Sequence, residues 1–162
     1  MCNGLLFRRK SMTDLEYMHL AYNEALKALE HDDVPIGAII VKDGKVITAS
    51  YNQKELLQDV SAHAEMLAIR QACEYLGSWH LDGCTLYSTL EPCIMCSGAI
   101  IQSRIDKVVF GASVNRWNGL SYYINEVDFN HNVDIVKGIY ENECSQLISD
   151  YFKGKRIKNR DI

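Results

Sequence analysis

Two short segments of this sequence constrain its fold more than any other feature, because together they form a pattern typical of a metal site. The first is His63-Ala64-Glu65, and the second is Pro92-Cys93-Ile94-Met95-Cys96. Zn²⁺ favours four tetrahedral ligands and readily accepts imidazole nitrogen and thiolate sulfur. His63, Cys93 and Cys96 would supply three ligands and leave the fourth position open for water, which is typical of a catalytic site. The chain must therefore fold so that both segments meet, and we expect one Zn²⁺ per chain.

Glu65 is the expected acid and base of this site. Zn²⁺ lowers the pKa of a bound water towards neutrality, and a carboxyl group within reach can take a proton from that water and pass it on. A Cys-x-x-Cys pair alone is as often half of a zinc ribbon or a redox pair. A lone His is more often a core or surface residue than a ligand. The combination of His, Glu, Pro and the two cysteines is much more specific.

The rest of the chain carries further matches to one known family. They are Val34 to Ala38, Ala62 to Leu67, Gly77 to Trp79, Thr85 to Cys96, Ser103 to Ile105, Val108 to Ala112, Asn130-His131 and Ser149 to Phe152. With these stretches, which run from about Thr13 to Arg156, the chain resembles bacterial tRNA-specific adenosine deaminases of the TadA type, within the cytidine deaminase-like superfamily. The same His-x-Glu and Pro-Cys-x-x-Cys signature is typical of zinc nucleobase deaminases.

This resemblance implies a function and a set of site residues. It implies hydrolytic deamination of the wobble adenosine of a tRNA anticodon stem-loop to inosine, with release of ammonia. It also implies a cytoplasmic homodimer whose partner subunit shapes the RNA site. Glu65 would be the catalytic acid and base, and the substrate would be bound through Val34, Asn52, Ala64, Leu90, Phe152, Lys155 and Arg156. Val34 and Asn52 would line the base pocket, and Ala64 and Leu90 would offer backbone contacts near the water and the amine.

The order of helical and extended patterns predicts a three-layer α/β/α domain around a central mixed sheet of about five strands, which is the cytidine deaminase-like fold. A capping box at Thr13 and Glu16 starts a helix that runs to about residue 30. Its predicted core stripe consists of Leu15, Met18, Tyr22, Ala25, Leu26 and Leu29. Strands at 36–41 and 46–49 flank Asp43-Gly44, which is a strong hairpin signal.

The second half of the chain continues this alternation of helices and strands. We expect a helix at 63–76 ended by Gly77, a strand at 84–90, a helix to about 103 with Pro92 in its first turn, and strands at 107–111 and 133–136. A helix at 140–152 should bury Cys144, Leu147, Ile148, Tyr151 and Phe152. The basic residues that follow it fit a phosphate-contacting patch, although such a tail is often only a solvated end.

The length and composition favour one domain in a reducing compartment. We expect residues 12–162 to form a single zinc-dependent deaminase domain with a basic C-terminal helix, and residues 1–11 to be a disordered extension. Met12 is then a candidate for the true start. The net charge of −4 means that RNA binding must come from local basic patches. Cys73, Cys84 and Cys144 read as buried free thiols, which favours the cytosol. No apolar run is long enough for a membrane span.

The segment 113–130 departs from the family pattern. Where many relatives carry an acidic residue followed by a Gly-containing run, this chain has Ser113-Val114-Asn115-Arg116-Trp117. Asn132 also stands where an Arg is usual. The aromatic residues of the segment either pack a lid and dimer contacts or stack on a splayed RNA base. These differences concern RNA contacts and not the zinc chemistry.

Two other functions share part of the pattern. One is a deaminase of free bases or nucleosides, such as guanine or cytosine, and the basic C-terminal helix speaks against it. The other is a non-catalytic, zinc-stabilised binding module. Glu65 and the presence of only three protein ligands speak against that module.

Overall fold

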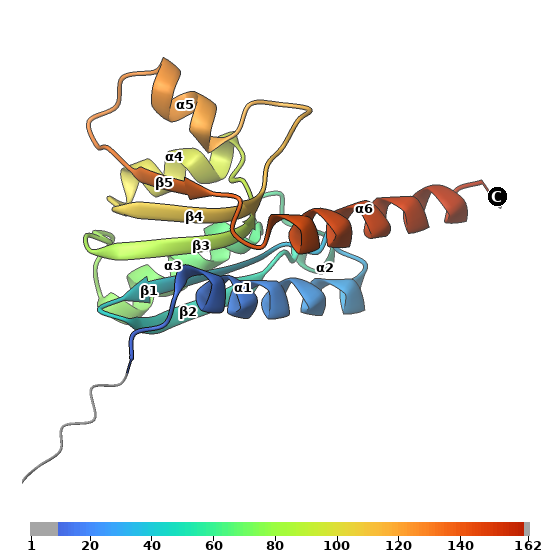
Figure 1. Cartoon of the computed structure of the whole chain (residues 1–162), viewed down its shortest axis with the longest axis horizontal. Coiled ribbons are helices and arrows are strands. Elements are labelled where there is room, and N and C mark those ends of the chain that lie inside the picture. Colours follow the sequence, from blue (N-terminus) through green and yellow to red (C-terminus); the bar gives the residue numbers. More distant parts are fainter. Residues whose placement is uncertain (1–9, 161–162) are drawn as a thin grey trace, which may run out of the picture.

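The computed structural model describes residues 10–160, so most of the expected N-terminal extension lies outside the described residues. A five-stranded sheet runs through the centre of the molecule in the order β2-β1-β3-β4-β5 (Figure 1). The strands are β1 Gly37–Lys42, β2 Lys45–Tyr51, β3 Cys84–Leu90, β4 Lys107–Ala112 and β5 Asp134–Lys137. β1 is antiparallel to both neighbours, whereas β3, β4 and β5 are parallel. The predicted mixed sheet is confirmed.

Helices cover both faces of this sheet. They are α1 Asp14–Ala28, α2 Lys54–Leu57, α3 Ala64–Leu76, α4 Ile94–Gln102, α5 Leu120–Glu126 and α6 Glu141–Lys158. One core contains Ile40, Leu86 and Phe110 of the sheet together with residues of α3, α4 and α5. The other contains Ile39 and the remaining alternate strand positions, packed against α1. Because successive strand residues face opposite sides, these two cores establish the predicted three layers.

The hairpin and the first helix begin as the sequence predicts. Asp43 and Gly44 both have positive φ, at 50° and 74°, as a two-residue hairpin turn requires. Thr13 Oγ1 accepts from the Glu16 backbone N–H at 3.2 Å, and the Thr13 N–H donates to the Glu16 carboxylate at 2.6 Å. The capping box is therefore confirmed. None of the described helices is long and apolar enough to cross a membrane.

The predicted core stripe of α1 is wrong in three places, because Leu15, Leu26 and Leu29 are exposed. The buried face instead consists of Tyr17 and Met18 near the start of the helix, followed by three alanines, Ala21, Ala25 and Ala28. A Cβ placed on Gly37 would lie 1.9 Å from the carbonyl oxygen of Ala21. The helix backbone thus touches β1 directly, and leucines do not fit between them.

The C-terminal part of the chain differs from the prediction in two ways. The segment 113–130 contains a helix, α5, that the irregular pattern did not predict. α6 continues to Lys158 instead of ending near Phe152, and its C-terminal half projects beyond the sheet (Figure 1). Phe152 is 45% exposed, so its predicted burial is wrong. The physical reason is that no layer of the fold lies opposite this part of the helix.

Candidate metal and catalytic site

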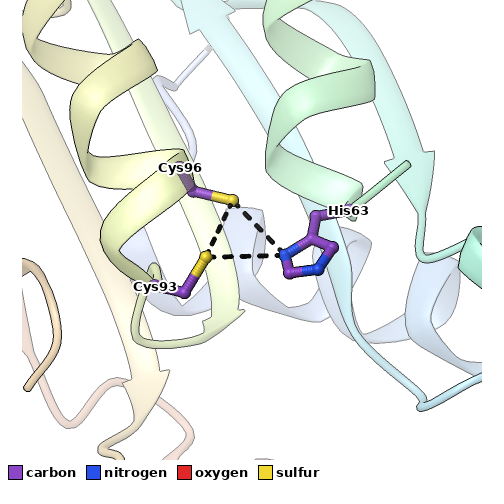
Figure 2. A group of neighbouring side chains, drawn as sticks. All are labelled: His63, Cys93 and Cys96. Carbon is purple, nitrogen blue, oxygen red and sulfur yellow. Dashed lines mark hydrogen bonds between the residues drawn. The ribbon is translucent and has the colours of Figure 1, made fainter. Parts of the chain in front are cut away.

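The structure brings His63, Cys93 and Cys96 together at the start of two helices (Figure 2). His63 is the N-cap of α3 and Cys93 is the N-cap of α4, which follows directly after β3. The Cys93 Sγ atom lies 3.6 Å from the Cys96 Sγ atom, and each sulfur lies 3.6 Å from Nδ1 of His63. These donor atoms could hold one metal ion.

Both helices begin one or two residues later than predicted. His63 and Cys93 have extended backbones, with ψ values of 150° and 178°, and therefore precede the first helical turns. Pro92 lies before Cys93, so its predicted place in the first turn is wrong. As the N-cap residue, Cys93 lies at the N-terminal end of α4. The unpaired N–H groups and the dipole there favour thiolates.

The close contact of the two cysteines moves their pKa values in opposite directions. The pKa of Cys93 is lowered to about 4, first because the Cys96 thiol donates a hydrogen bond to it and also because His63 does. The pKa of Cys96 is raised because it gives that hydrogen bond and is buried. The pKa of His63 is raised, mainly by its hydrogen bond to Cys93. The lowered pKa of Cys93 favours a thiolate there, and a cation is suited to replace the remaining thiol proton.

Glu65 lies beside this cluster. It follows His63 by two residues, in the first turn of α3, and its side chain is buried. Its Oε1 atom lies 3.3 Å from the Ser88 hydroxyl oxygen. Its Oε2 atom is buried without a hydrogen-bond partner among the described residues. Burial raises the pKa of the carboxyl group. A carboxyl with a free oxygen and a raised pKa is suited to take up and release protons.

A second buried oxygen without a partner lies on Asn52. The Asn52 side-chain amide donates to the Val34 carbonyl at 3.2 Å, which holds the two predicted pocket residues together. Its Oδ1 atom has no partner in the described part of the chain. Buried polar atoms are rarely left unpaired in native proteins. The free oxygens of Asn52 and Glu65 are therefore candidates to bind a ligand.

Ala64 and Leu90 lie next to the site, whereas Phe152, Lys155 and Arg156 lie on the projecting half of α6. Ala64 opens α3 directly after His63, and Leu90 ends β3 just before Pro92. Lys155 forms an ion pair with Asp32. Asp32 precedes Val34 by two residues, so this part of α6 is fastened to the segment that leads into the candidate base pocket.

Sequence reasoning missed two buried residues in β3 and directly after it, Ser88 and Glu91. Ser88 is fully buried and contacts Glu65. Its signal is alternation, since Leu86, Ser88 and Leu90 fall on the strand face that α3 covers, where a polar residue is unexpected. Glu91 is also buried, and its carboxylate accepts from the Ser121 backbone N–H at 2.9 Å. It thereby fastens the start of α5 to the segment that carries Cys93.

Comparison with known proteins agrees with this geometry. The family model described as MafB19-like deaminase matches residues 12–156. A tRNA-specific adenosine deaminase of Bacillus subtilis (strain 168) is 46% identical over 147 residues, covering 89% of this chain and 91% of that protein. A solved structure from a study of A-to-I editing by tRNA:A34 deaminases has a TM-score of 0.76 and 42% identity, and covers 81% of this chain and 97% of its own.

A second solved structure is more distant. It is a guanine deaminase of Bacillus subtilis with a TM-score of 0.63 and 32% identity, covering 76% of this chain and 83% of its own. This guanine deaminase is thus less similar to the chain, in sequence and in structure, than the structure from the study of tRNA:A34 deaminases. The chain belongs to the MafB19-like deaminases and, among them, to the tRNA-specific adenosine deaminase family.

Proposed function

We propose that this chain catalyses the hydrolytic deamination of adenosine to inosine at the wobble position of a tRNA, with release of ammonia. One observation carries the proposal: a His63, Cys93 and Cys96 cluster lies beside the buried carboxyl of Glu65, whose Oε2 atom is free. Hydrolytic removal of an amino group from an aromatic base needs a metal that activates water and a nearby group that acts as acid and base, and this site offers both.

We infer that the metal is zinc, because the donor atoms fit it. Zn–S bonds of about 2.3 Å and Zn–N bonds of about 2.0–2.1 Å at tetrahedral angles separate two sulfurs by about 3.8 Å and a sulfur and a nitrogen by about 3.6 Å. The three observed separations are each 3.6 Å. Zinc bound there would supply a Lewis acid that makes water a nucleophile at neutral pH.

Glu65 would carry the protons of the reaction. The attacking water must lose a proton as it adds, the adenine ring nitrogen must gain one, and the departing amine must gain the second proton of that water, from the hydroxyl now on the ring carbon, before it leaves as ammonia. One carboxyl that alternates between its two protonation states can perform all three transfers. Its raised pKa brings these states closer in free energy near neutral pH. The backbone of Ala64 and Leu90 would contact the water and the amine.

The base would bind between Val34 and Asn52, and the RNA around it would contact α6. The free Oδ1 atom of Asn52 is an acceptor for a hydrogen-bond donor of the nucleoside. Phe152 is exposed on α6 and could stack on a base, and Arg156 could contact a phosphate. This basic helix favours a nucleic acid over a free base as the substrate.

The proposal includes a cytoplasmic location, where tRNA is available, and a second copy of the chain as partner. Val60 and Ile94 are 76% and 64% exposed, and they lie just before His63 and just after Cys93 in the sequence. Exposed apolar side chains beside a site are suited to contact with another protein. We expect light scattering to give twice the 18.4 kDa of one chain, and charged substitutions at both residues to give the monomer.

A substrate panel tests the proposed reaction. The purified chain would be offered an RNA anticodon stem-loop with a wobble adenosine, and separately free adenosine, cytidine and guanine. Inosine in the RNA and released ammonia would be measured. We expect turnover of the stem-loop alone. Release of ammonia from guanine without inosine in RNA would instead favour a free-base deaminase, and bound zinc with no turnover of any substrate would favour a binding module.

A further inference from the structure

Ser88 connects two groups of the proposed site that are otherwise separate. Its hydroxyl oxygen lies 2.7 Å from the carbonyl oxygen of Leu90 and 3.3 Å from Oε1 of Glu65. Ser88 is fully buried on β3, so water does not compete for either contact. A hydroxyl has one proton to donate and two lone pairs to accept with. The Leu90 carbonyl can only accept, whereas a carboxyl group can either accept or donate.

These contacts leave the two oxygens of Glu65 in different states. Oε1 has the Ser88 hydroxyl as partner, and Oε2 has none among residues 10–160. A carboxyl that is held at one oxygen cannot rotate freely about its last torsion, which is otherwise broad for Glu. The free oxygen is therefore held in one direction. The single Ser88 proton serves one acceptor at a time: the hydroxyl donates to the Leu90 carbonyl while it accepts from a protonated Glu65, and it turns to donate to Oε1 when Glu65 is ionised. It can therefore hold the carboxyl in both protonation states.

We propose that Ser88 is a positioning residue for the reaction. It holds Glu65 through Oε1 so that Oε2 faces the reacting atoms, and in the protonated state of Glu65 it also donates to the Leu90 carbonyl, whose second lone pair remains free for the substrate amine. This inference rests on the proposed function, because it assigns Ser88 a part in the proton transfers of Glu65. A positioned acid or base acts mainly on the chemical step, and a loose one lowers kcat before it changes substrate binding.

Two substitutions of the same shape isolate the hydroxyl. Ser88→Thr keeps it and adds a methyl group, and Ser88→Val has the same outline without the hydroxyl, so the packing cost in the buried strand is matched between them. We expect S88V to lower kcat for the stem-loop about 5- to 10-fold relative to S88T, as the loss of one ordinary hydrogen bond would do. KM and the zinc content per chain should be equal in the two variants.

Coupling to Glu65 separates positioning from a merely structural role. In a Glu65→Gln background, replacing S88T by S88V should change the residual rate less than two-fold, because the carboxyl that Ser88 positions is then absent. Equal kcat values for S88T and S88V in the otherwise wild-type chain would overturn the proposal. So would a loss that appears in KM or in zinc content, or one that persists unchanged without Glu65.

A smaller substitution covers the case in which the added methyl groups prevent folding. Ser88→Ala removes the hydroxyl and adds no atoms, so it should fold and show the same fall in kcat relative to the wild-type chain. A wild-type value for S88A would overturn the proposal. The wild-type chain itself reports on the proposed function. If it deaminates a free base and not RNA, that function fails, while the Ser88 comparison can still be made on the free base.

Discussion

Asp32 holds Lys155 of α6 in an ion pair, although the two residues lie 123 positions apart in the chain. The Tyr151 hydroxyl strengthens the connection by donating to the Asp32 backbone carbonyl at 2.7 Å. Asp32 itself has a left-handed backbone, with φ at 56°. This turn leads through Asp33 into Val34, so the ion pair fastens α6 at Lys155 to the segment that leads into the proposed base pocket.

The ion pair predicts that Lys155 and Arg156 contribute unequally to RNA binding. A free cationic side chain that contacts a phosphate releases about one counterion. It thereby changes the slope of log K for RNA binding against log salt concentration, called the salt slope below, by about 1. Arg156 is exposed and has no ion-pair partner among the described residues. We expect Arg156→Ala to make the slope shallower by about 1, and Lys155→Ala to do so by clearly less, because Lys155 must first leave Asp32. Binding of the stem-loop at several salt concentrations measures both slopes.

A third variant checks the cause of this difference. Asp32→Asn frees Lys155 without changing the shape of the residue, so the salt slope should become steeper than that of the wild-type chain. Adding Lys155→Ala to Asp32→Asn should then make the salt dependence of binding shallower by as much as Arg156→Ala does. Equal slopes for the two single cation variants in the wild-type background would show that the ion pair does not limit Lys155.

Substitution of Glu65 should abolish most of the turnover without lowering the zinc content. We expect Glu65→Gln to keep about one zinc per chain, because Glu65 is not one of the three clustered donors. Its turnover should fall by about 10²–10⁴-fold, the usual contribution of a general acid and base. Metal analysis and single-turnover kinetics measure the two quantities. His63→Ala is the control, since it should lose the metal as well as the activity. A metal-free Glu65→Gln protein would place Glu65 among the ligands.

The same substitution should stabilise the metal-free protein in a pH-dependent way. Burial raises the pKa of Glu65 above its value in the unfolded chain, which is about 4.3. Between these two pKa values the folded state binds more protons than the unfolded state, so this group's contribution to stability is lost as the pH rises. Glutamine does not titrate, so the variant does not lose stability in this way. Urea unfolding in the presence of a chelator should show that the free energy of unfolding of Glu65→Gln rises relative to that of the wild-type chain from about pH 4 upward. A gain that is independent of pH would contradict the assignment.

Zinc binding should release fewer protons than two ordinary thiols would. The pKa of Cys93 is lowered to about 4 and that of Cys96 is raised, so we expect Cys93 to bind zinc without losing a proton and Cys96 to lose one. Zinc needs both sulfurs deprotonated. We expect about one thiol proton per zinc at pH 8, with a contribution from His63 that grows as the pH falls, because its pKa is raised. Calorimetry in buffers of different ionisation enthalpy counts these protons. Release of two thiol protons at pH 8 would contradict the lowered pKa of Cys93.

The layers of the fold and the metal cluster could be predicted because they depend on short-range patterns in the sequence. The Asp43-Gly44 turn, the Thr13 and Glu16 capping box and the buried strand 84–90 are short-range signals, and the structure matches them. Leu15 and Phe152 were misplaced because periodicity shows which face of a helix is apolar but not what lies opposite that face. The close approach of α1 to Gly37 and the projection of α6 are tertiary features without a local signal.

The contacts behind the site were hidden for a related reason. Glu65 can be recognised from its distance to His63 along the chain, but Ser88 reaches it from another strand. Glu91 likewise acts across the fold, on the N–H group of Ser121. α5 itself was missed because its seven residues contain no strong cap and no clear apolar period. Its position depends on Glu91 and on the Pro92 carbonyl, which accepts from the Leu120 N–H at 3.0 Å.

Both ends of the altered loop 113–119 are fixed against Glu91, which precedes Cys93 by two residues. Before the loop, the Ala112 carbonyl accepts from the Glu91 N–H at 2.8 Å. After it, Gly119 packs so closely on Glu91 that an added Cβ would lie 2.5 Å from the carboxyl carbon. Trp117, between these fixed ends, is 57% exposed. An exposed indole on a loop anchored at both ends is suited to stack on a nucleotide that flanks the reacting adenosine.

The last prediction compares Trp117 with Val114 of the same loop. Val114 has no hydrogen-bonding group and is partly buried, so it cannot bind a sugar hydroxyl or a phosphate. Stacking on an aromatic side chain is worth roughly 1–3 kcal/mol per base. We therefore expect Trp117→Ala to lower kcat/KM for the stem-loop by about 5- to 150-fold, and Val114→Ala to change it much less.

A DNA stem-loop of the same sequence shows which contact is lost. Stacking uses the face of a base and does not depend on the 2′-hydroxyl, which is the group that distinguishes RNA from DNA. Trp117→Ala should therefore cost a similar factor on both nucleic acids. A loss on RNA alone would mean that the indole reads the sugar instead of the base. Negligible effects of both substitutions would show that the loop does not touch the nucleic acid, and its exposed aromatic surface would then be left for the partner subunit.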